Sequence, residues 1–498
     1  MSPPRLRLLA ADFFERPVTL RLPFRFGVVT LTQAPQLFVR ARIALADGRE
    51  GDGVSAEMLA PKWFDKSPAL SNEDNFDQLR RSLALARESL IAAGTNTAFG
   101  LSAAVDRPHH DACAKAGLNG LVASFGLALI DRAIIDALGR LEGASAFALV
   151  RANRLGLDAT TATDLAGFDL DALLGRLVPA VTIRARHTVG LVDALTRAQT
   201  AGQRIDDGLP ESLEEVAATY GHRFYKLKVG GNIEADVDRL RGIATVLDRG
   251  PSYQATLDGN EQYQSIDEVM ALWRRIGEEP RLARLKASII FIEQPIGRDR
   301  ALTASVQALS DQVPIEIDES DADVMVFPRA RALGYRGISS KSCKGFYRAL
   351  INRARIARWN AEHQKGIHAR LQGDPRYFMS AEDLTTQAGV ALQQDLCLAT
   401  LIGATHVERN GHHYVDGMTG APKAEQDEFL RDHPDIYHRA SNGRPRVTIR
   451  DGAIALNSLA TPGLGVGPMP DFAAMTETLL PPLARKRDIV MLTIPPEE

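Results

Sequence analysis

The chain has 498 residues, of which 45% are hydrophobic, 24% are charged and 6% are aromatic, a composition typical of ordinary globular proteins. Its 59 basic and 62 acidic residues give a net charge of −3, which offers no electrostatic attraction to nucleic acid or to an anionic membrane. The cysteines, Cys113, Cys343 and Cys397, are far apart and form no CxxC motif. This spacing excludes a disulfide framework and a zinc ribbon.

The same composition indicates where the protein works. The longest apolar stretch, residues 121–130, is far too short to span a bilayer. Asp12 and Glu15 precede any long apolar core, so we expect no signal peptide. These features predict a soluble, cytoplasmic protein.

The first hundred residues predict strands followed by helices. The apolar run at residues 38–45 ends at the turn Asp47-Gly48, which favours a hairpin. Ser71 and Asp74 form a capping box before a helix that extends to Gly94. A second, apolar helix is expected over residues 121–141.

From about residue 187 the pattern becomes a repeat of short apolar runs and amphipathic helical stretches. The runs, about eight in number, predict strands and crossover helices of a TIM (β/α)₈ barrel; a doubly wound sheet is the alternative. The predicted strands are residues 189–195, 224–229, 253–258, 289–293, 314–318, 337–341, 378–382 and 405–409.

After Asn410 the repeat ends, and a long irregular segment precedes a hairpin predicted over residues 447–450 and 453–456. The glycine-rich stretch 462–467 lacks a surrounding strand–helix pair, so we interpret it as a turn rather than a dinucleotide site. Both chain ends lie outside the repeat, and we expect them to form one α+β capping domain. The predicted organisation is residues 1–160 as the N-terminal part of the capping domain, 185–410 as the barrel with the active site, and 411–498 as the segment that returns to the capping domain.

Five consecutive predicted strands end in a charged residue. The terminal charges are 30, 35, 25 and 23 residues apart, and each gap fits one strand–helix repeat. Barrel active sites form at the carboxyl ends of the strands, so these residues are expected to meet there. They are Lys228, Asp258, Glu293, Asp318 and Lys341.

Strand alternation places Lys226 on the same inward face as Lys228. Taken singly, a carboxylate at a strand end is more typical of a helix cap, and the lysines alone are typical of a solvated surface. As a set, inward charges in a packed barrel need a partner or a metal. Carboxylates from three successive strands favour a hard cation, Mg²⁺ or Mn²⁺.

At these residues the sequence resembles the enolase superfamily and, within it, the mandelate racemase/muconate lactonizing enzyme family. The KxK of the second strand matches residues 226–228, and the Asp-x-Asn of the third matches residues 258–260. Glu293-Gln294-Pro295 fits the fourth strand, Asp318-Glu319-Ser320 the fifth and Lys341 the sixth. Residues 23–27 and 462–466 resemble the opening and closing parts of the capping domain.

The resemblance implies a metal-dependent isomerase or lyase. Its metal ligands would be Asp258, Glu293 and Asp318, with Asn260 in support. The ion would bind a substrate carboxylate and stabilise the enediolate that forms when the α-proton leaves. Lys228 would be the general base, Lys226 would help to depress its pKa, and Lys341 would be the second acid or base.

Several reactions remain compatible with this arrangement. Racemisation or epimerisation and cycloisomerisation are favoured; the alternatives are an acid-sugar dehydratase of the same superfamily and a catalytically silent relative that binds a carboxylate. Lys344 is a rival to Lys341 for the sixth-strand role. The eighth strand lacks the Asp-x-Asp that dipeptide epimerases use, which counts against that activity.

The remaining candidates are weaker. Arg25 and Glu382 are candidate substrate contacts, and Trp63 and Phe64 lie either in a loop over the substrate or in the capping-domain core. The pairs His109-His110 and His412-His413 have no third ligand at an accepted spacing, so we interpret them as exposed loop histidines. We expect a small-molecule carboxylate partner, no nucleic-acid or membrane partner, and a homo-oligomer.

Overall fold

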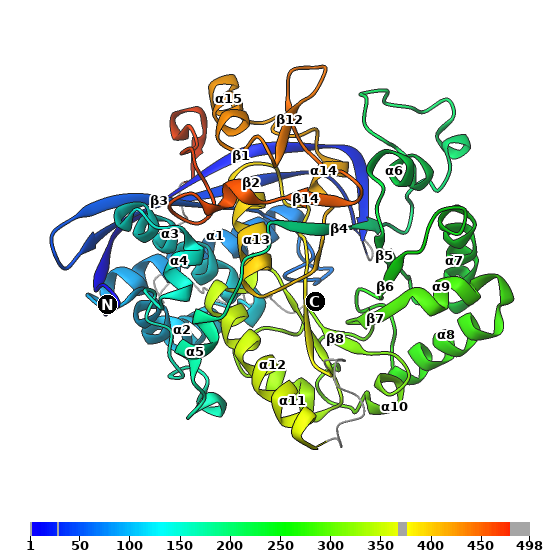
Figure 1. Cartoon of the computed structure of the whole chain (residues 1–498), viewed down its shortest axis with the longest axis horizontal. Coiled ribbons are helices and arrows are strands. Elements are labelled where there is room, and N and C mark those ends of the chain that lie inside the picture. Colours follow the sequence, from blue (N-terminus) through cyan, green and yellow to red (C-terminus); the bar gives the residue numbers. More distant parts are fainter. Residues whose placement is uncertain (1, 27–28, 367–375, 479–498) are drawn as a thin grey trace, which may run out of the picture.

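The computed structural model describes residues 2–26, 29–366 and 376–478. A long antiparallel sheet and a group of helices lie beside a barrel of parallel strands (Figure 1). No helix in these ranges is both long enough and apolar enough to cross a membrane. The α/β class with a TIM barrel and a capping domain, predicted from the repeat, is confirmed.

The barrel is a closed sheet whose parallel neighbours follow the order of the chain, and it closes by pairing β11 with β4. One further strand, β14 (Ala453–Ala455), pairs antiparallel with β4. The barrel strands are β4 (Thr182–Val189), β5 (Phe224–Lys228), β6 (Gln254–Asp258), β7 (Ile289–Glu293), β8 (Ile315–Ile317), β9 (Gly337–Ser340), β10 (Phe378–Ala381) and β11 (His406–Glu408).

The helices between these strands cover the outside of the barrel, as amphipathic crossover helices must if the apolar sides of the strands are to be buried. In α7, for example, Val237, Leu240 and Ala244 are buried at helical spacing. The helices are α6 (Leu213–Tyr220), α7 (Ile233–Leu247), α8 (Ile266–Glu278), α9 (Ala283–Ser288), α10 (Gln307–Ser310), α11 (Val326–Ala332), α12 (Phe346–Gly366) and α13 (Val390–Leu401).

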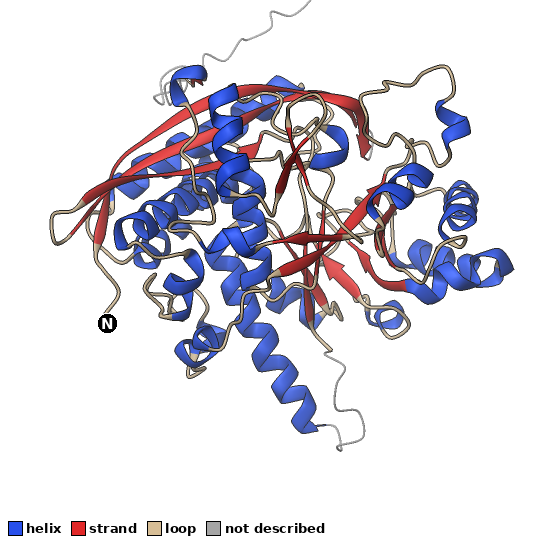
Figure 2. Ribbon diagram, turned by 45° about the horizontal axis from the view of Figure 1, so that its top comes forward, coloured by secondary structure: helices blue, strands red, loops and turns tan. Residues whose placement is uncertain are grey.

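The capping sheet is built from β1 (Leu6–Phe26), β2 (Val29–Leu45), β3 (Glu50–Met58) and the short β15 (Thr476–Glu477). Figure 2 shows its long strands crossing above the barrel strands. The turn at Asp47-Gly48 joins β2 to β3, as predicted. Because β15 pairs with β1, residues near both ends of the described chain meet in one sheet.

The capping helices are α1 (Asn72–Ala92), α2 (Ala98–Lys115), α3 (Gly120–Glu142), α4 (Ala146–Arg151) and α5 (Leu170–Gly175). The capping box of Ser71 and Asp74 at the start of α1 is present. Helix α3 is buried on nearly all sides because it lies between the capping sheet and α1 and α2. The apolar run of residues 121–141 is therefore explained by burial.

Two boundaries predicted from the sequence are wrong. The first barrel strand is β4, which ends at Val189, where the predicted strand 189–195 begins. The hairpin predicted over residues 447–450 and 453–456 forms only at its turn, where Arg450 and Ala453 make a single antiparallel bridge. Beyond the turn, β13 (Pro445–Val447) pairs with β12 (Tyr437–Arg439), while β14 joins the barrel. Apolar alternation identified these segments as extended but could not identify their partners. The helices α14 (Gly411–Tyr414) and α15 (Lys423–Asp432) complete the C-terminal region.

Candidate active site

The carboxyl ends of the second to fourth barrel strands bring charged side chains together in register. Lys228 on β5 lies opposite Asp258 on β6, and Asp258 lies opposite Glu293 on β7. Each residue ends its strand, so all are delivered to the same rim of the barrel. Asp318 and Lys341 follow β8 and β9 directly.

Lys226 is the hub of this cluster and is only 2% exposed. Its Nζ lies 3.0 Å from an Asp258 oxygen, 2.6 Å from Glu293, 2.9 Å from Glu382 and 3.1 Å from Glu408. Burial by itself would favour the neutral amine, but these carboxylates raise the pKa of Lys226 well above its ordinary value. Lys226 is therefore held as an ammonium ion.

The other two proposed catalytic lysines each contact one of the outer carboxylates. Lys228 Nζ lies 2.5 Å from Asp258 Oδ2, and Lys341 Nζ lies 2.8 Å from Asp318 and 3.8 Å from Glu293. Burial opposes the charged form of Lys341, but Asp318 and Glu293 raise its pKa. Because β5 and β9 are half the barrel apart in strand order, the two amines approach from opposite sides.

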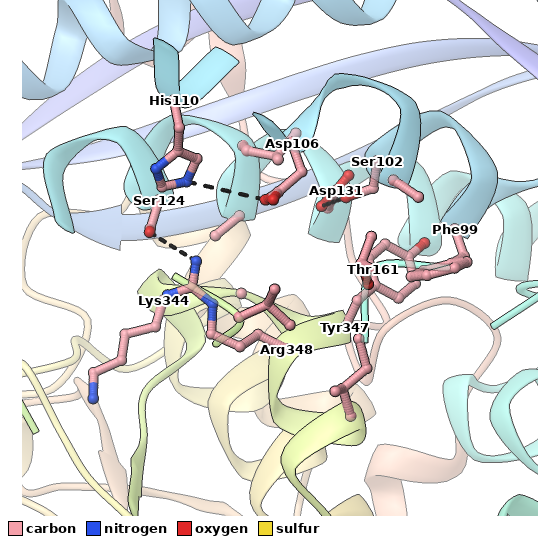
Figure 3. A pocket seen from close by; sticks show the side chains of 16 residues that line it. Phe99, Ser102, Asp106, His110, Ser124, Asp131, Thr161, Lys344, Tyr347 and Arg348 are labelled. Atoms are coloured by element: carbon pink, nitrogen blue, oxygen red, sulfur yellow. Dashed lines mark hydrogen bonds and ion pairs between the residues drawn. The ribbon is translucent and has the colours of Figure 1, made fainter. Parts of the chain in front are cut away.

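Lys344, the rival of Lys341, is also buried and also contacts Asp318, at 2.8 Å. Its Nζ donates to the main-chain oxygens of Asp318 and Ser339, both at 2.9 Å. Its ammonium group points away from Asp131 and His110 of a second cavity, which it borders (Figure 3). Lys344 does not line the cavity at the rim of the barrel, whereas Lys341 does.

The rim cavity is bordered by part of the charged cluster on the barrel side and by residues of the capping domain on the other. Its volume is about 30 Å³, enough to admit water. Capping residues cover it, and Trp63 lies 5.2 Å above the ammonium of Lys341. The lining includes Phe24, Met58, Ala60 and Trp63 from the cap, and Lys226, Lys228, Asp258, Asn260, Asp318 and Lys341 from the barrel.

The structure assigns different locations to Trp63 and Phe64, for which the sequence allowed either a loop over the substrate or the capping-domain core. Trp63 borders the cavity, whereas the Phe64 ring packs edge-on against Phe125 of α3, with ring centroids 5.2 Å apart. Neighbouring residues of one loop therefore serve the site and the capping-domain core.

Two candidate substrate contacts lie elsewhere in the structure. Arg25 is exposed, and Phe24, the residue before it on β1, lines the cavity in its place. Glu382 is 1% exposed and pairs with Arg186 and Lys226, so its carboxylate is already engaged inside the barrel. Asn260 does line the cavity, and its Nδ2 donates to Glu319 at 3.3 Å.

Sequence reasoning missed a deeper layer of charge below the rim. Arg186 on β4 forms an ion pair with Glu382, and Glu316 accepts a hydrogen bond from Ser380 Oγ at 2.9 Å. Oxygens of Glu293, Glu316 and Glu382 lie within 4.8 Å of one another. The alternation Glu316-x-Asp318 on one strand could have indicated this layer, because residues two apart share a face.

The proposed ligands fit a divalent cation by their chemistry and charge. Asp258 and Asp318 line the cavity, whereas Glu293, Glu316 and Glu382 do not; Glu293 ends the strand between the two lining carboxylates and contacts Lys226 and Lys341. Burial, together with the negative charges of Asp258 and Glu382, raises the pKa of Glu293 well above its ordinary value. A hard cation at the rim would relieve that repulsion with carboxylate oxygens alone, the ligands that Mg²⁺ prefers.

The interpretation of both histidine pairs as exposed loop residues is wrong. His109 and His110 lie in α2, and His109 is completely buried. His413 is 3% exposed, and the rings of His412 and His413 pack beside His187 of β4. The folded barrel brings its last strand beside its first, so sequence spacing gave no indication of these neighbours.

One family model matches part of the chain. Residues 208–358 match the family model described as enolase C-terminal domain-like. A comparison with curated protein sequences gives no significant match.

Solved structures of similar fold cover nearly the whole chain. A mandelate racemase/muconate lactonizing protein from Herpetosiphon aurantiacus is 16% identical with a TM-score of 0.55, over 92% of this chain and 98% of that one. A dipeptide epimerase from Enterococcus faecalis, complexed with Mg and a dipeptide, is 15% identical with a TM-score of 0.56, over 92% and 99%. An enolase from Bradyrhizobium, complexed with magnesium and mandelic acid, is 15% identical with a TM-score of 0.56, over 94% and 97%.

These matches confirm the resemblance to the enolase superfamily and to its mandelate racemase/muconate lactonizing members. At such low identity the structural likeness establishes the fold, so the reaction has to be argued from the residues of this chain.

Proposed function

We propose that the chain is a magnesium-dependent isomerase or lyase of the enolase superfamily that removes the α-proton of a small carboxylate substrate. The observation that carries the proposal is the charged cluster at the rim of the barrel, where two buried lysines from opposite strands flank three carboxylates from the strands between them. Both lysines and two of these carboxylates, Asp258 and Asp318, line the rim cavity. The Mg-bound structures of similar fold support the choice of cofactor.

Asp258, Glu293 and Asp318 are the proposed ligands of the ion. When bound, the ion would supply positive charge to a substrate carboxylate as negative charge develops on it. A carbon acid beside a carboxylate is very weak, so this electrostatic contribution has to remove a large part of the barrier.

The lysines of this chain would move the proton. Lys228 would accept the α-proton on one side of the substrate, and Lys341 would donate or accept a proton on the opposite side. Lys226 contacts the same Asp258 oxygen as Lys228, at 3.0 Å. Its raised pKa keeps it charged, as its proposed action on Lys228 requires.

Two amines on opposite sides favour racemisation, epimerisation or cycloisomerisation. An acid-sugar dehydratase is the second candidate, since elimination of water starts with the same proton abstraction; it needs in addition a donor for the leaving hydroxyl group.

Solvent-deuterium incorporation at the α-carbon, measured across a library of carboxylic acids with added Mg²⁺, tests the proposal. We expect exchange for at least one acid, its loss after removal of the metal with EDTA, and a decrease of at least about 100-fold in Lys228→Ala or Lys341→Ala. Lys115→Ala, an exposed lysine of α2, is the control and should exchange like wild type.

Other outcomes contradict particular parts of the proposal. Tight binding of acids without exchange would favour a catalytically silent relative. Equal exchange in wild type and both folded lysine variants would refute the assigned roles. Loss of water from an acid sugar would identify the dehydratase.

A further inference from the structure

Histidines from three neighbouring barrel strands or their ends gather on the outer wall of the barrel, away from the carboxylate rim. His187 lies on β4, His222 lies two residues before the start of β5, and His412 lies in α14 after β11. These strands are adjacent in the closed sheet, in the order β11-β4-β5. In Figure 1, α14 lies beside β4 and β14.

Strand alternation explains why His187 points outward. Its neighbours Arg186 and Thr188 face the barrel interior, where Arg186 pairs with Glu382 and Thr188 donates to Glu408. The side chain between them must therefore lie on the opposite side. No residue of the proposed catalytic cluster belongs to this histidine group.

The imidazoles lie close enough to one another to share a metal ion. One nitrogen from each of His187, His222 and His412 lies within 4.8 Å of the others. A zinc ion with ligands at about 2.0–2.1 Å holds its nitrogen atoms roughly 3.4 Å apart, so small ring rotations would close the site.

Each ring also has a nitrogen free for coordination. His187 Nδ1, His222 Nε2 and His412 Nε2 are buried and have no hydrogen-bond partner among the described residues. His222 Nδ1 lies 3.0 Å from the main-chain oxygen of Ala185, so Nδ1 carries the proton and Nε2 presents its lone pair. Metal-binding histidines are commonly oriented in this way, by an acceptor for the other ring N–H that is a carboxylate, a main-chain carbonyl or a water molecule.

We propose that His187, His222 and His412 form a second metal site, for a zinc-class divalent transition ion, that is separate from the magnesium site. Imidazole nitrogen favours zinc, whereas Mg²⁺ prefers oxygen. His412 borders a cavity of about 400 Å³, from which a water molecule can supply the fourth ligand.

The histidine site is connected to the rim cavity through packing contacts. Tyr414, two residues after His412, packs its ring on Phe24 with centroids 4.4 Å apart, and Phe24 lines the rim cavity. An ion on His412 would therefore fix the short helix on which this lining residue rests.

The test is a cobalt titration of metal-free, full-length protein in excess Mg²⁺, which occupies the oxygen site. We expect about one equivalent of Co²⁺ to bind with the strong visible absorption of a low-coordinate nitrogen site, and Zn²⁺ to displace it. His412→Ala and His222→Gln should lose this absorption. His438→Gln, a histidine that borders the same cavity outside the cluster, should retain it.

X-ray absorption on cobalt-loaded wild type provides a readout that does not depend on the folding of variants, because scattering by imidazole rings identifies histidine ligands. Oxygen-only coordination, no binding in excess Mg²⁺, or unchanged binding in folded His412→Ala would overturn the proposal. None of these outcomes depends on the proposed proton abstraction.

Discussion

At the scale of single residues, four lysines of the barrel are almost completely buried, and each contacts at least one carboxylate. Lys226, Lys228, Lys341 and Lys344 are between 2% and 7% exposed. Isolated ammonium ions at such burial would be very costly, and only paired charges are tolerated there. The lysines differ in what else they reach: Lys228 and Lys341 reach the cavity, Lys226 also holds the carboxylates together, and Lys344 reaches main-chain oxygens.

Lys344→Met should separate a structural lysine from a catalytic one. The substitution leaves the main-chain oxygens of Asp318 and Ser339 without their donor, so we expect a loss of about 1–3 kcal/mol in unfolding free energy. Deuterium exchange should stay within about tenfold of wild type, since Lys344 does not line the cavity. Chemical denaturation and exchange assays, with Lys341→Met in parallel, check this. If Lys344→Met abolishes exchange and Lys341→Met does not, the two roles are reversed.

Lys226→Met should be among the most damaging substitutions in the barrel. It removes the cation shared by Asp258, Glu293, Glu382 and Glu408, and an uncompensated buried charge costs about 3–5 kcal/mol. Urea unfolding measures the effect, and exposed Lys115→Met should change stability by less than about 0.5 kcal/mol. If Lys226→Met unfolds at the same urea concentration as wild type, the carboxylates do not need this ammonium group for the stability of the fold.

At the scale of elements, the capping domain contributes to the site through β1 and through the loop between β3 and α1. Phe24 near the end of β1 and Trp63 in the loop both border the rim cavity. The loop is held at its far end by the capping box of α1, in which Ser71 and Asp74 exchange hydrogen bonds. The barrel therefore supplies the charged groups, and the cap supplies the apolar cover that excludes water from them.

Trp63→Ala should slow exchange without unfolding the protein. The ring covers the Lys341 ammonium at 5.2 Å, and its removal opens the charged groups to water, which weakens their electrostatic interactions. We expect at least about a tenfold loss in kcat/KM for an acid that the library identifies. Ser71→Ala is the control: it should lose about 1 kcal/mol of stability and leave kcat unchanged. Equal kcat/KM in Trp63→Ala and wild type would exclude this role of the cover.

At the scale of the whole molecule, the capping helices also pack against the barrel helix α12 on the side away from the sheet. Asp131 of α3 and Tyr347 of α12 border the cavity between them (Figure 3). Asp131 is 3% exposed and accepts a hydrogen bond from Ser102 at 2.7 Å. Burial raises the pKa of Asp131 to about 8, so the folded protein holds a proton that the unfolded chain releases near its ordinary pKa of about 4.

This proton makes stability depend on pH with a definite sign. The raised pKa means that the contribution of Asp131 is complete below about pH 4 and is lost as the pH rises to about 8. Asp131→Asn has no proton to lose, so its stability relative to wild type should increase by roughly 3 kcal/mol between pH 5 and pH 8. Urea unfolding at both pH values measures this. The exposed Asp111→Asn should show no such change. If the difference in unfolding free energy between Asp131→Asn and wild type does not change with pH, Asp131 carries no proton in the folded protein.

The sequence predicted the barrel well because its signals are local. Each strand is a short apolar run, each helix repeats its apolar residues at helical spacing, and Ser71 and Asp74 lie within one turn. The terminal residues from Lys228 to Lys341 could be identified for the same reason, since every parallel strand of a barrel delivers its carboxyl end to one rim.

The predictions that failed were those that depended on contacts between residues distant in sequence. Residues 447–456 were identified as extended, but β13 and β14 pair with different strands. The neighbour of Arg186 across the closed sheet could not be identified either, because closure brings together β4 and β11, more than two hundred residues apart.

The sequence by itself therefore determined the fold class and the carboxylates and lysines of the rim, because these follow from periodicity and from the position at which each strand ends. Only the tertiary structure decided which lysine reaches the cavity, which aromatic residue covers it, and that His187, His222 and His412 are neighbours. These are distances between side chains on separate elements, and such distances are set by barrel closure and by the packing of the cap, neither of which leaves a local pattern in the chain.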